Sequence, residues 1–243
     1  MTLQGKTALV TGGGTGIGWS IARELAAAGA RVAIAGRREN VLRDAASRWT
    51  GDPPIEFHAV DVADRSSVRR LFGWATERIG PITILVNCAG FNVPNRTMAA
   101  LRPEQWDELL AVNASGAYYC MYEALPQMRA MKDGLIINVS SIAGKRAMAL
   151  GGVGYCASKF AMTALGTCVG NEDNQHGIRV TNIYPGEANT PILDHRPTPV
   201  TDAHRAAILQ PDDIGTLVAA IARLPPRAHV PEVIIKPTCA AYA

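Results

Sequence analysis

Several features that mark other classes of protein are missing from this chain of 243 residues. It has no run of about 20 uninterrupted apolar residues, so no membrane-spanning helix is predicted. The N-terminus has no basic region followed by an apolar run and a cleavage site, so no secretory signal is predicted. The sequence also has no internal repeat, no low-complexity tract and no break that would act as a linker.

The net charge of the chain is small. Lysine and arginine number 24 against 21 acidic residues, which gives a net charge of +3. This small, scattered excess argues against a nucleic-acid partner. The cluster Arg65, Arg69 and Arg70 follows helical spacing and is predicted to be a solvated helix face.

Cysteine patterns typical of metal sites and disulfide frameworks are also missing. The five cysteines show no CxxC pair and no metal-ligand spacing, so no metal site is predicted. An odd number of cysteines in mostly apolar surroundings indicates reduced thiols. We therefore expect a soluble cytoplasmic protein without a membrane partner.

The hydrophobic pattern predicts a single α/β domain over residues 1–243. Hydrophobic residues make up 48% and charged residues 19%, as in globular enzymes with a substantial core. Six β runs alternate with helical patterns and a last short strand follows, which predicts a Rossmann-type, doubly wound parallel sheet flanked by helices. The expected strands are 7–11, 31–35, 55–60, 82–87, 134–140, 179–183 and 233–236. The first expected helix follows the glycine turn and ends at residue 28. The other expected helices are 38–50, 64–80, 103–131, 155–170 and 209–223.

A glycine-rich turn follows the first strand. Residues 12–18 read Gly-Gly-Gly-Thr-Gly-Ile-Gly and lead into a helical pattern. Glycines let backbone N–H groups approach a pyrophosphate, whose charge is favoured at a helix N-terminus. A glycine-rich loop can also bind nothing, but the order strand, glycine turn, helix favours nucleotide binding.

Two arginines follow the second strand. In this architecture the end of that strand faces the adenosine ribose, where an acidic residue selects NAD and an arginine accommodates the 2′-phosphate of NADP. Here Arg37 and Arg38 occupy that place and no acid is present. A guanidinium matches phosphate geometry, which favours NADP. The alternative is that both arginines begin a solvated helix.

Tyr155 and Lys159 lie four residues apart, so on a helix both side chains share one face. A free tyrosine titrates near ~10, and a neighbouring cation lowers that pKa. Reaching roughly 7 would require about 4 kcal/mol, for which Lys159 and an oxidised nicotinamide ring are candidates. Taken alone, such a pair is more often an ordinary surface feature.

These motifs resemble the short-chain dehydrogenase/reductase family. Residues 11–18 match its signature Thr-Gly-x-x-x-Gly-Ile-Gly throughout, and further motifs follow in the family's order over essentially the whole chain. The motifs that carry the resemblance are the glycine loop, Asn87 with Ala89 and Gly90, Asn113, Ser141, Tyr155 with Lys159, and Pro185 with Gly186. Cys88 stands where the family usually has a second asparagine, and we interpret it as a small apolar substitute rather than a nucleophile.

The resemblance implies a cofactor and its contacts. It implies NADP (NADPH), with NAD as the alternative, and Arg37 as the main reader of the 2′-phosphate. Asp61 and Val62 would hold the adenine, although an aspartate here could instead cap the helix starting near Asp64. The implied cofactor-binding residues are Gly12, Thr15, Gly16, Ile17, Gly18, Arg37, Arg38, Asp61, Val62, Asn87, Ala89, Gly90, Tyr155, Lys159, Pro185, Gly186, Ala188 and Thr190.

The resemblance also implies the chemistry. Ser141, which fits the family's Ser-x-x-Gly better than Ser140, would polarise the substrate, and Tyr155 would exchange the proton. Lys159 would lower the pKa of Tyr155 and hold the nicotinamide ribose. Asn113 would position a water that relays protons to Lys159. Pairing of helices 103–131 and 155–170 would give a homodimer or homotetramer.

The C-terminal segment favours one substrate class. Residues 229–238 look like those of bacterial NADP-dependent serine and 3-hydroxy-acid dehydrogenases. A substrate lid is expected at about 187–210, where Arg196 or Arg205 would grip the carboxylate of a small 3-hydroxy acid, unless both face solvent. The alternatives are a reductase of larger ketones or quinones and a non-catalytic NADP-binding protein.

Overall fold

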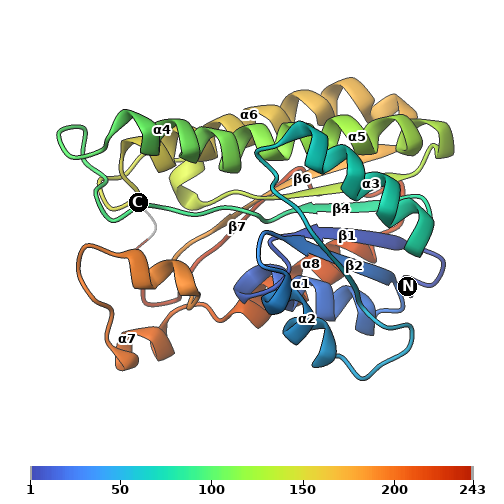
Figure 1. The fold of residues 1–243 in the computed structure, drawn as a ribbon, viewed down its shortest axis with the longest axis horizontal. Coiled ribbons are helices and arrows are strands. Elements are labelled where there is room, and N and C mark those ends of the chain that lie inside the picture. The colour runs from blue at the N-terminus through green and yellow to red at the C-terminus, as the bar shows by residue number, and fades with distance from the viewer. Residues whose placement is uncertain (1, 242–243) are drawn as a thin grey trace.

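A seven-stranded parallel sheet forms the centre of the computed structural model, which describes residues 2–241 (Figure 1). The strand order is β3-β2-β1-β4-β5-β6-β7, and every neighbouring pair is parallel. The strands are β1 (Thr7–Thr11), β2 (Arg31–Gly36), β3 (Glu56–Ala59), β4 (Ile84–Asn87), β5 (Gly134–Val139), β6 (Ile178–Pro185) and β7 (Glu232–Ile235). The predicted doubly wound parallel sheet is confirmed.

Helices cover both faces of the sheet. In Figure 1, α3, α4, α5 and α6 lie above the sheet and α1, α2 and α8 lie below it. The helices are α1 (Gly16–Ala27), α2 (Glu39–Ser47), α3 (Arg65–Ile79), α4 (Pro103–Leu110), α5 (Gly116–Met131), α6 (Val153–Asp173), α7 (Asp202–Ala207) and α8 (Pro211–Ala222). No helix in the described residues is long and apolar enough to cross a membrane.

The central strands are apolar on both sides because both sides are covered. Consecutive side chains of a strand point to opposite faces. Accordingly Val10 and Ile34 belong to the core under α1 and α8, whereas Leu9 and Ala33 belong to the core under α3 and α5. A parallel sheet buried in this way reads as continuous apolar runs, which is why its strands were predictable.

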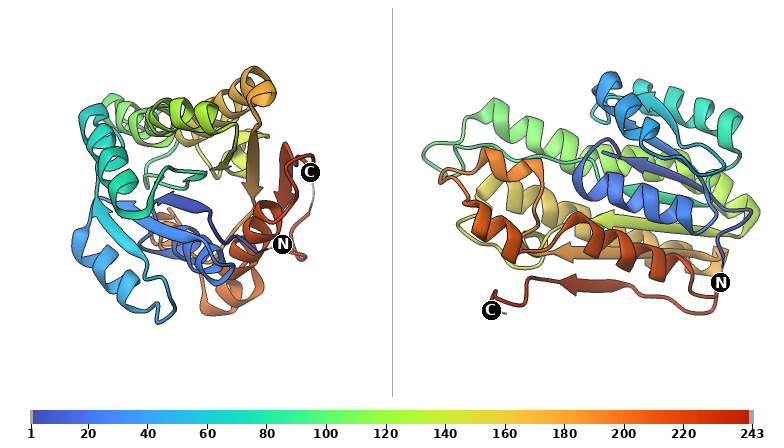
Figure 2. Two further views of the ribbon diagram at one scale, coloured as in Figure 1. Left: turned by 90° about the vertical axis from the view of Figure 1, so that its right-hand side faces the viewer. Right: turned by 90° about the horizontal axis from the view of Figure 1, so that it is seen from below.

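The chain changes direction between β1 and β4. From β1 it adds β2 and β3 on one side, then crosses to β4 and adds β5 to β7 on the other. In such sheets ligands bind in the crevice beyond the carboxyl ends of the strands at this switch point. Figure 2 shows the segment containing α7, in orange, projecting beyond the bulk of the sheet on one side.

The first and last large helices pack against each other. Helix α1 lies beside α8 on the lower face (Figure 1), and both bury apolar side chains in the same core. Ser20 Oγ of α1 donates a hydrogen bond to Asp212 Oδ1 of α8 at 2.7 Å. Gly215 permits this approach, because a Cβ there would lie 2.4 Å from Ser20 Oγ.

The helix expected over 103–131 is not continuous. A π-helical turn, Ala111–Ser115, separates α4 from α5, and Asn113 lies inside it. Single π-helical turns inside α-helices are frequent at functional sites. The helix is thus locally widened at Asn113.

Candidate active site

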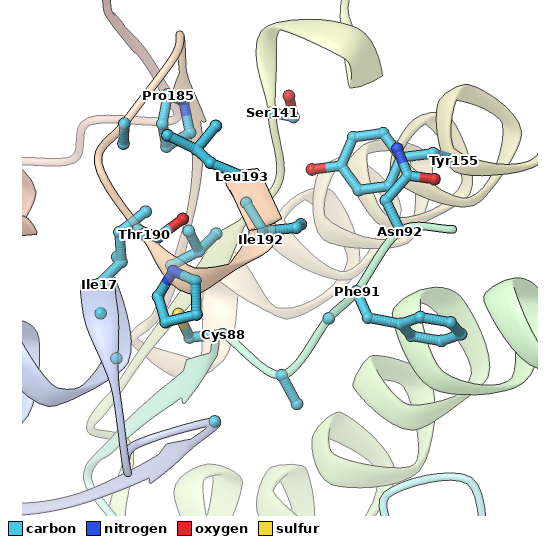
Figure 3. Close-up of a pocket in the computed structure, with 18 of the residues that line it drawn as sticks. Ile17, Cys88, Phe91, Asn92, Ser141, Tyr155, Pro185, Thr190, Ile192 and Leu193 are labelled. Atoms are coloured by element: carbon cyan, nitrogen blue, oxygen red, sulfur yellow. The ribbon is translucent and has the colours of Figure 1, made fainter. Parts of the chain in front are cut away.

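One cavity of about 750 Å³ gathers most of the residues selected from the sequence. It lies beyond the carboxyl ends of the strands and is partly shown in Figure 3. Its lining includes three of the four catalytic candidates, Ser141, Tyr155 and Lys159. It includes every predicted cofactor contact except Asn87. Asn113 also does not line it.

The glycine loop between β1 and α1 is shaped by close backbone contacts. Gly12 and Gly16 have φ of +67° and +51°, a conformation that favours glycine. A Cβ at Gly12 would lie 2.9 Å from the Ala89 backbone, and one at Gly18 would lie 2.3 Å from Gly12 O. Thr15 precedes α1 without capping it through its side chain. The first turn of α1 therefore faces the cavity with N–H groups suited to an anion.

Arg37 and Arg38 line the cavity next to this loop. The Arg37 side chain is 59% exposed, and its Nη1 lies 3.8 Å from Glu108 Oε1, which is a weak ion pair. Arg38 precedes α2 and makes no side-chain cap. Both guanidinium groups are therefore available to a ligand.

Asp61 lies at the same end of the cavity, beyond β3. Its Oδ1 accepts a hydrogen bond from the backbone N–H of Ala63 at 3.0 Å. The cap of α3 is a different residue, Asp64, which accepts from the N–H of Ser66 at 2.8 Å. The alternative in which Asp61 serves as a helix cap is therefore not what the structure contains.

Asn87 has a structural position under the cavity. Its Nδ2 donates to Asn138 Oδ1 at 2.9 Å, and Asn138 Nδ2 donates to Asn182 Oδ1 at 3.1 Å. These three amides link β4, β5 and β6, so we call them the asparagine ladder. Helix α6 reaches the ladder because Gly166 has no side chain, and a Cβ there would lie 2.2 Å from Asn182 Oδ1.

Ser141 and Tyr155 are neighbours in the cavity wall, where the tyrosine ring lies close to the loop that carries Ser141 (Figure 3). Ser141 follows β5, and Tyr155 lies in the first turns of α6. Burial raises the pKa of Tyr155 to about 12, while a hydrogen bond with Ser141 and the charge of Arg96 act in the opposite direction. The phenol of the unliganded chain is thus protonated at neutral pH.

Lys159 is buried below Tyr155. Its Nζ donates to the carbonyl oxygen of Val139 at 3.0 Å and lies 5.7 Å from the centroid of the Tyr155 ring. Burial lowers the pKa of Lys159 to about 8. Burial therefore outweighs other influences on both groups in the unliganded chain, and a Tyr155 pKa lowered by Lys159 stays a prediction for the cofactor complex.

Asn113 holds the loop that follows β4. Its Oδ1 accepts from the N–H of Phe91 at 3.0 Å, and its Nδ2 donates to Phe91 O and to Ser158 Oγ, both at 3.0 Å. Gly90 lies between the amide of Asn113 and the amine of Lys159. A Cβ at Gly90 would be 3.2 Å from Asn113 Oδ1 and 3.3 Å from Lys159 Nζ. The side chain of Asn113 thus positions the loop, while its predicted role toward a water is untested.

The two serines after β5 have different environments. The Ser140 hydroxyl is buried and donates to the backbone carbonyl of Lys159 at 3.1 Å. Ser141 Oγ accepts from the N–H of Ala143 at 3.1 Å and interacts with Tyr155. This arrangement favours Ser141 as the residue that meets a substrate.

Cys88 is a half-buried thiol in the cavity wall. Burial raises its pKa to about 11, although the charge of Lys159 opposes this. At neutral pH the group is a thiol rather than a thiolate, and only the thiolate is an effective nucleophile. The structure agrees with its interpretation as an apolar substitute. The described residues contain no group of three or more His, Cys, Asp or Glu suited to a metal ion.

The two arginines expected to grip a carboxylate are placed differently. Arg196 lines the cavity, where its Nη1 lies 2.9 Å from Glu187 Oε1. Arg205 does not line it and instead pairs with Asp194 at 2.6 Å and Asn189 at 3.3 Å. The structure adds Arg96, a cavity-lining residue that the sequence motifs did not indicate. The one available signal was an arginine in a loop, residues 91–100, without acidic residues.

Comparison with known proteins agrees with this geometry. An uncharacterised oxidoreductase of Staphylococcus saprophyticus is 34% identical over 237 residues, which cover 97% of this chain and 98% of that protein. The chain is also 33% identical to a part of the glycine betaine reductase ATRR of Emericella nidulans, but it spans only 19% of that protein's length.

Two solved structures are similar over nearly their whole length. A metagenomic short-chain oxidoreductase in complex with NADP is 33% identical, with a TM-score of 0.84 and coverage of 99% and 100%. The closed form of a serine dehydrogenase complexed with NADP+ is 26% identical, with a TM-score of 0.88 and coverage of 98% and 97%. The family model described as short chain dehydrogenase matches residues 6–199. The chain therefore belongs to the short-chain dehydrogenases, oxidoreductases that act on CH–OH or carbonyl groups.

Proposed function

We propose that this enzyme is an NADP-dependent oxidoreductase that interconverts an alcohol and a carbonyl compound. The observation that carries the proposal is that one cavity joins the glycine loop, the guanidinium of Arg37 and the pair Ser141–Tyr155. The two similar structures bound to NADP support the choice of cofactor.

The cavity residues fit such a cofactor. The glycine positions form a cradle that a Cβ would fill, and the uncapped start of α1 suits a pyrophosphate. Arg37 and Arg38 would hold the 2′-phosphate, and Asp61 and Val62 the adenine. Near the substrate, Ala188 and Thr190 would hold the carboxamide, and Lys159 the ribose hydroxyls.

The chain's own groups would handle the proton and the substrate. When bound, NADP(H) supplies or accepts the hydride. Ser141 Oγ would donate a hydrogen bond to the substrate oxygen, and the Tyr155 hydroxyl would give it a proton or take one from it. A charged Lys159 favours the phenolate form of Tyr155. Asn113 holds the loop that follows β4 and, we propose, positions a water through which protons reach Lys159.

The substrate side is proposed to accept a small 3-hydroxy acid. A short likeness at the C-terminus and the similarity to a serine dehydrogenase support this class, and Arg196 is the residue of the original pair that lines the cavity. Residues 187–210 would act as its lid. A larger ketone or quinone is the second candidate, because the cavity is roomy at about 750 Å³.

Turnover distinguishes an enzyme from a non-catalytic NADP-binding protein. We expect Tyr155→Phe to lower kcat by roughly 10²–10⁴-fold, the usual contribution of a general acid or base. Its affinity for NADPH should be unchanged, because the ring remains. Tyr119→Phe, the same substitution on α5 at a residue that does not line the cavity, is the matched control. Equal turnover of Tyr155→Phe and wild type would refute the assignment.

The proposal also covers the location of the protein in the cell and its assembly. The described cysteines are all free, which suits the cytoplasm. Large aromatic side chains are exposed on the outer faces of α4, α5 and α6, which supports a homodimer or homotetramer pairing the long helices. These side chains are Trp106, Tyr118, Tyr122 and Phe160, with 36–48% exposure. Light scattering that finds a monomer at micromolar concentration would overturn the assembly.

A further inference from the structure

Arg96 is a buried cation in the wall of the cavity. The residue is only 9% exposed and lies in the loop that follows β4. Its guanidinium donates to three backbone carbonyls, those of Val93 at 2.7 Å, Leu150 at 2.8 Å and His195 at 3.0 Å. Three separate segments around the substrate end of the cavity are thereby tied together.

These bonds satisfy only part of the guanidinium. Arginine has five N–H donors, of which the three carbonyls use one on Nε and one on each terminal nitrogen. One N–H on each terminal nitrogen has no hydrogen-bond partner in the part of the chain that the structure describes. Two N–H groups on terminal nitrogens are what a carboxylate accepts in a bidentate contact.

The charge of Arg96 is also without a counterion. No carboxylate of residues 2–241 forms a salt bridge with it, although a buried charge is costly unless it is paired. Burial lowers the pKa of Arg96, and the neighbouring positive charge of Arg196 lowers it further. Both effects indicate a site where an added anion would be stabilising.

The surrounding charges do not supply that anion. At this end of the cavity, Glu187 is the one carboxylate among the lining residues that the structure describes. Its Oε1 already contacts both Arg196 at 2.9 Å and His204 at 2.8 Å. Lys236 adds another cation to the lining. With Arg96 and Arg196 against the one carboxylate of Glu187, the net charge near Tyr155 is positive.

We propose that Arg96, with Arg196 beside it, forms a binding subsite for a carboxylate of the substrate, next to Tyr155. The inference rests on the proposed function and narrows its substrate to hydroxy or oxo acids. Arg96 thereby takes the carboxylate-binding role first expected of Arg196 or Arg205, and Arg196 assists while its own charge is shared with Glu187. If Arg96 only held the three segments together, its three carbonyl contacts would be enough, and its charge would not need to stay unpaired beside the cavity.

The test compares two probes of the same shape that differ in charge. Butyrate and butyramide are titrated into the enzyme–NADP+ complex by calorimetry at fixed ionic strength and pH 7. We expect butyrate to bind at least about 10-fold more tightly, in line with a charge-assisted contact. Arg96→Gln should remove this preference and leave the affinities for butyramide and NADP+ unchanged. Arg205→Ala, which removes a cation outside the cavity, is the matched control and should keep the preference.

Each outcome decides the proposal. Equal affinities of the wild-type complex for the two probes would overturn it, as would an Arg96→Gln variant that still prefers butyrate. If Arg96→Gln fails to fold, the wild-type comparison stands alone, and Arg96→Lys, which keeps the charge, should keep the preference for butyrate. The proposed function is tested separately by NADPH oxidation with a carbonyl panel. Absence of turnover together with a clear butyrate preference would refute the function but support the subsite.

Discussion

Replacing Lys159 by methionine should make the unliganded protein more stable while abolishing its activity. Lys159 is buried, and burial lowers its pKa from the ordinary 10.5 to about 8. Such a fall corresponds to about 3 kcal/mol of unfavourable free energy at neutral pH. The variant also loses the hydrogen bond to Val139 O, for which we subtract about 1 kcal/mol. The net expectation is a gain of about 2 kcal/mol in the free energy of unfolding at pH 7.

The pH dependence provides the sharper assay. Below about pH 8 Lys159 is protonated in both the folded and the unfolded chain, so the cost is present in full. Between pH 8 and 10.5 the unfolded chain binds more protons than the folded one, so wild-type stability rises with pH relative to Lys159→Met. Urea unfolding of both proteins without cofactor, at fixed protein concentration from pH 7 to 10, measures this difference.

The wild-type-minus-variant comparison largely cancels the contributions of other titrating groups. From pH 7 to pH 10 the stability difference should change by about 2.5 kcal/mol in favour of the wild type, so that the advantage of Lys159→Met disappears. An advantage that is independent of pH, or a variant less stable than wild type at pH 7, would refute the reasoning that burial dominates at this lysine.

Two further predictions concern the cofactor and the sheet. Arg37→Ala should weaken NADPH binding by about 10- to 100-fold, because a charge-assisted contact contributes roughly 1.5–3 kcal/mol, and it should leave NADH binding unchanged. Fluorescence titration measures both affinities, with Arg43→Ala on the exposed side of α2 as the control. Equal loss of affinity for both cofactors would contradict the assignment of Arg37 to the 2′-phosphate. Asn138→Ala should destabilise the fold by about 2–6 kcal/mol, since it orphans one buried amide group on Asn87 and one on Asn182. Urea unfolding tests this against exposed Asn174→Ala, and a loss below 1 kcal/mol would show that water replaces the ladder.

Local sequence patterns carried the fold and much of the site. Strand and helix periods, and the glycines after β1, act within a few residues, so they can be read without knowing the fold. The position of the cavity followed from the strand order, which is typical of parallel sheets. Nearly all predicted cofactor contacts line that cavity, although their roles toward a cofactor stay predictions.

What the sequence could not reveal depends on contacts between distant segments. Arg96 bonds to carbonyls 54 and 99 residues away, and no local motif surrounds it. Arg196 and Arg205 look alike in sequence, yet only Arg196 reaches the cavity. The spacing of Tyr155 and Lys159 predicted a shared helix face but not the burial that governs their pKa values, since burial is a property of the packed molecule.

The packing of α1 on α8 has a consequence for how the protein is made. The helix that begins at the glycine loop packs on β1 and β2 and is also covered by residues 211–222, so part of its apolar surface has no partner until α8 has been made. Pairings of such high sequence separation form late and slowly. A nascent or truncated chain that lacks α8 therefore leaves part of the apolar surface of α1 exposed, and such surface favours aggregation and chaperone binding. Complete packing of α1 therefore depends on α8.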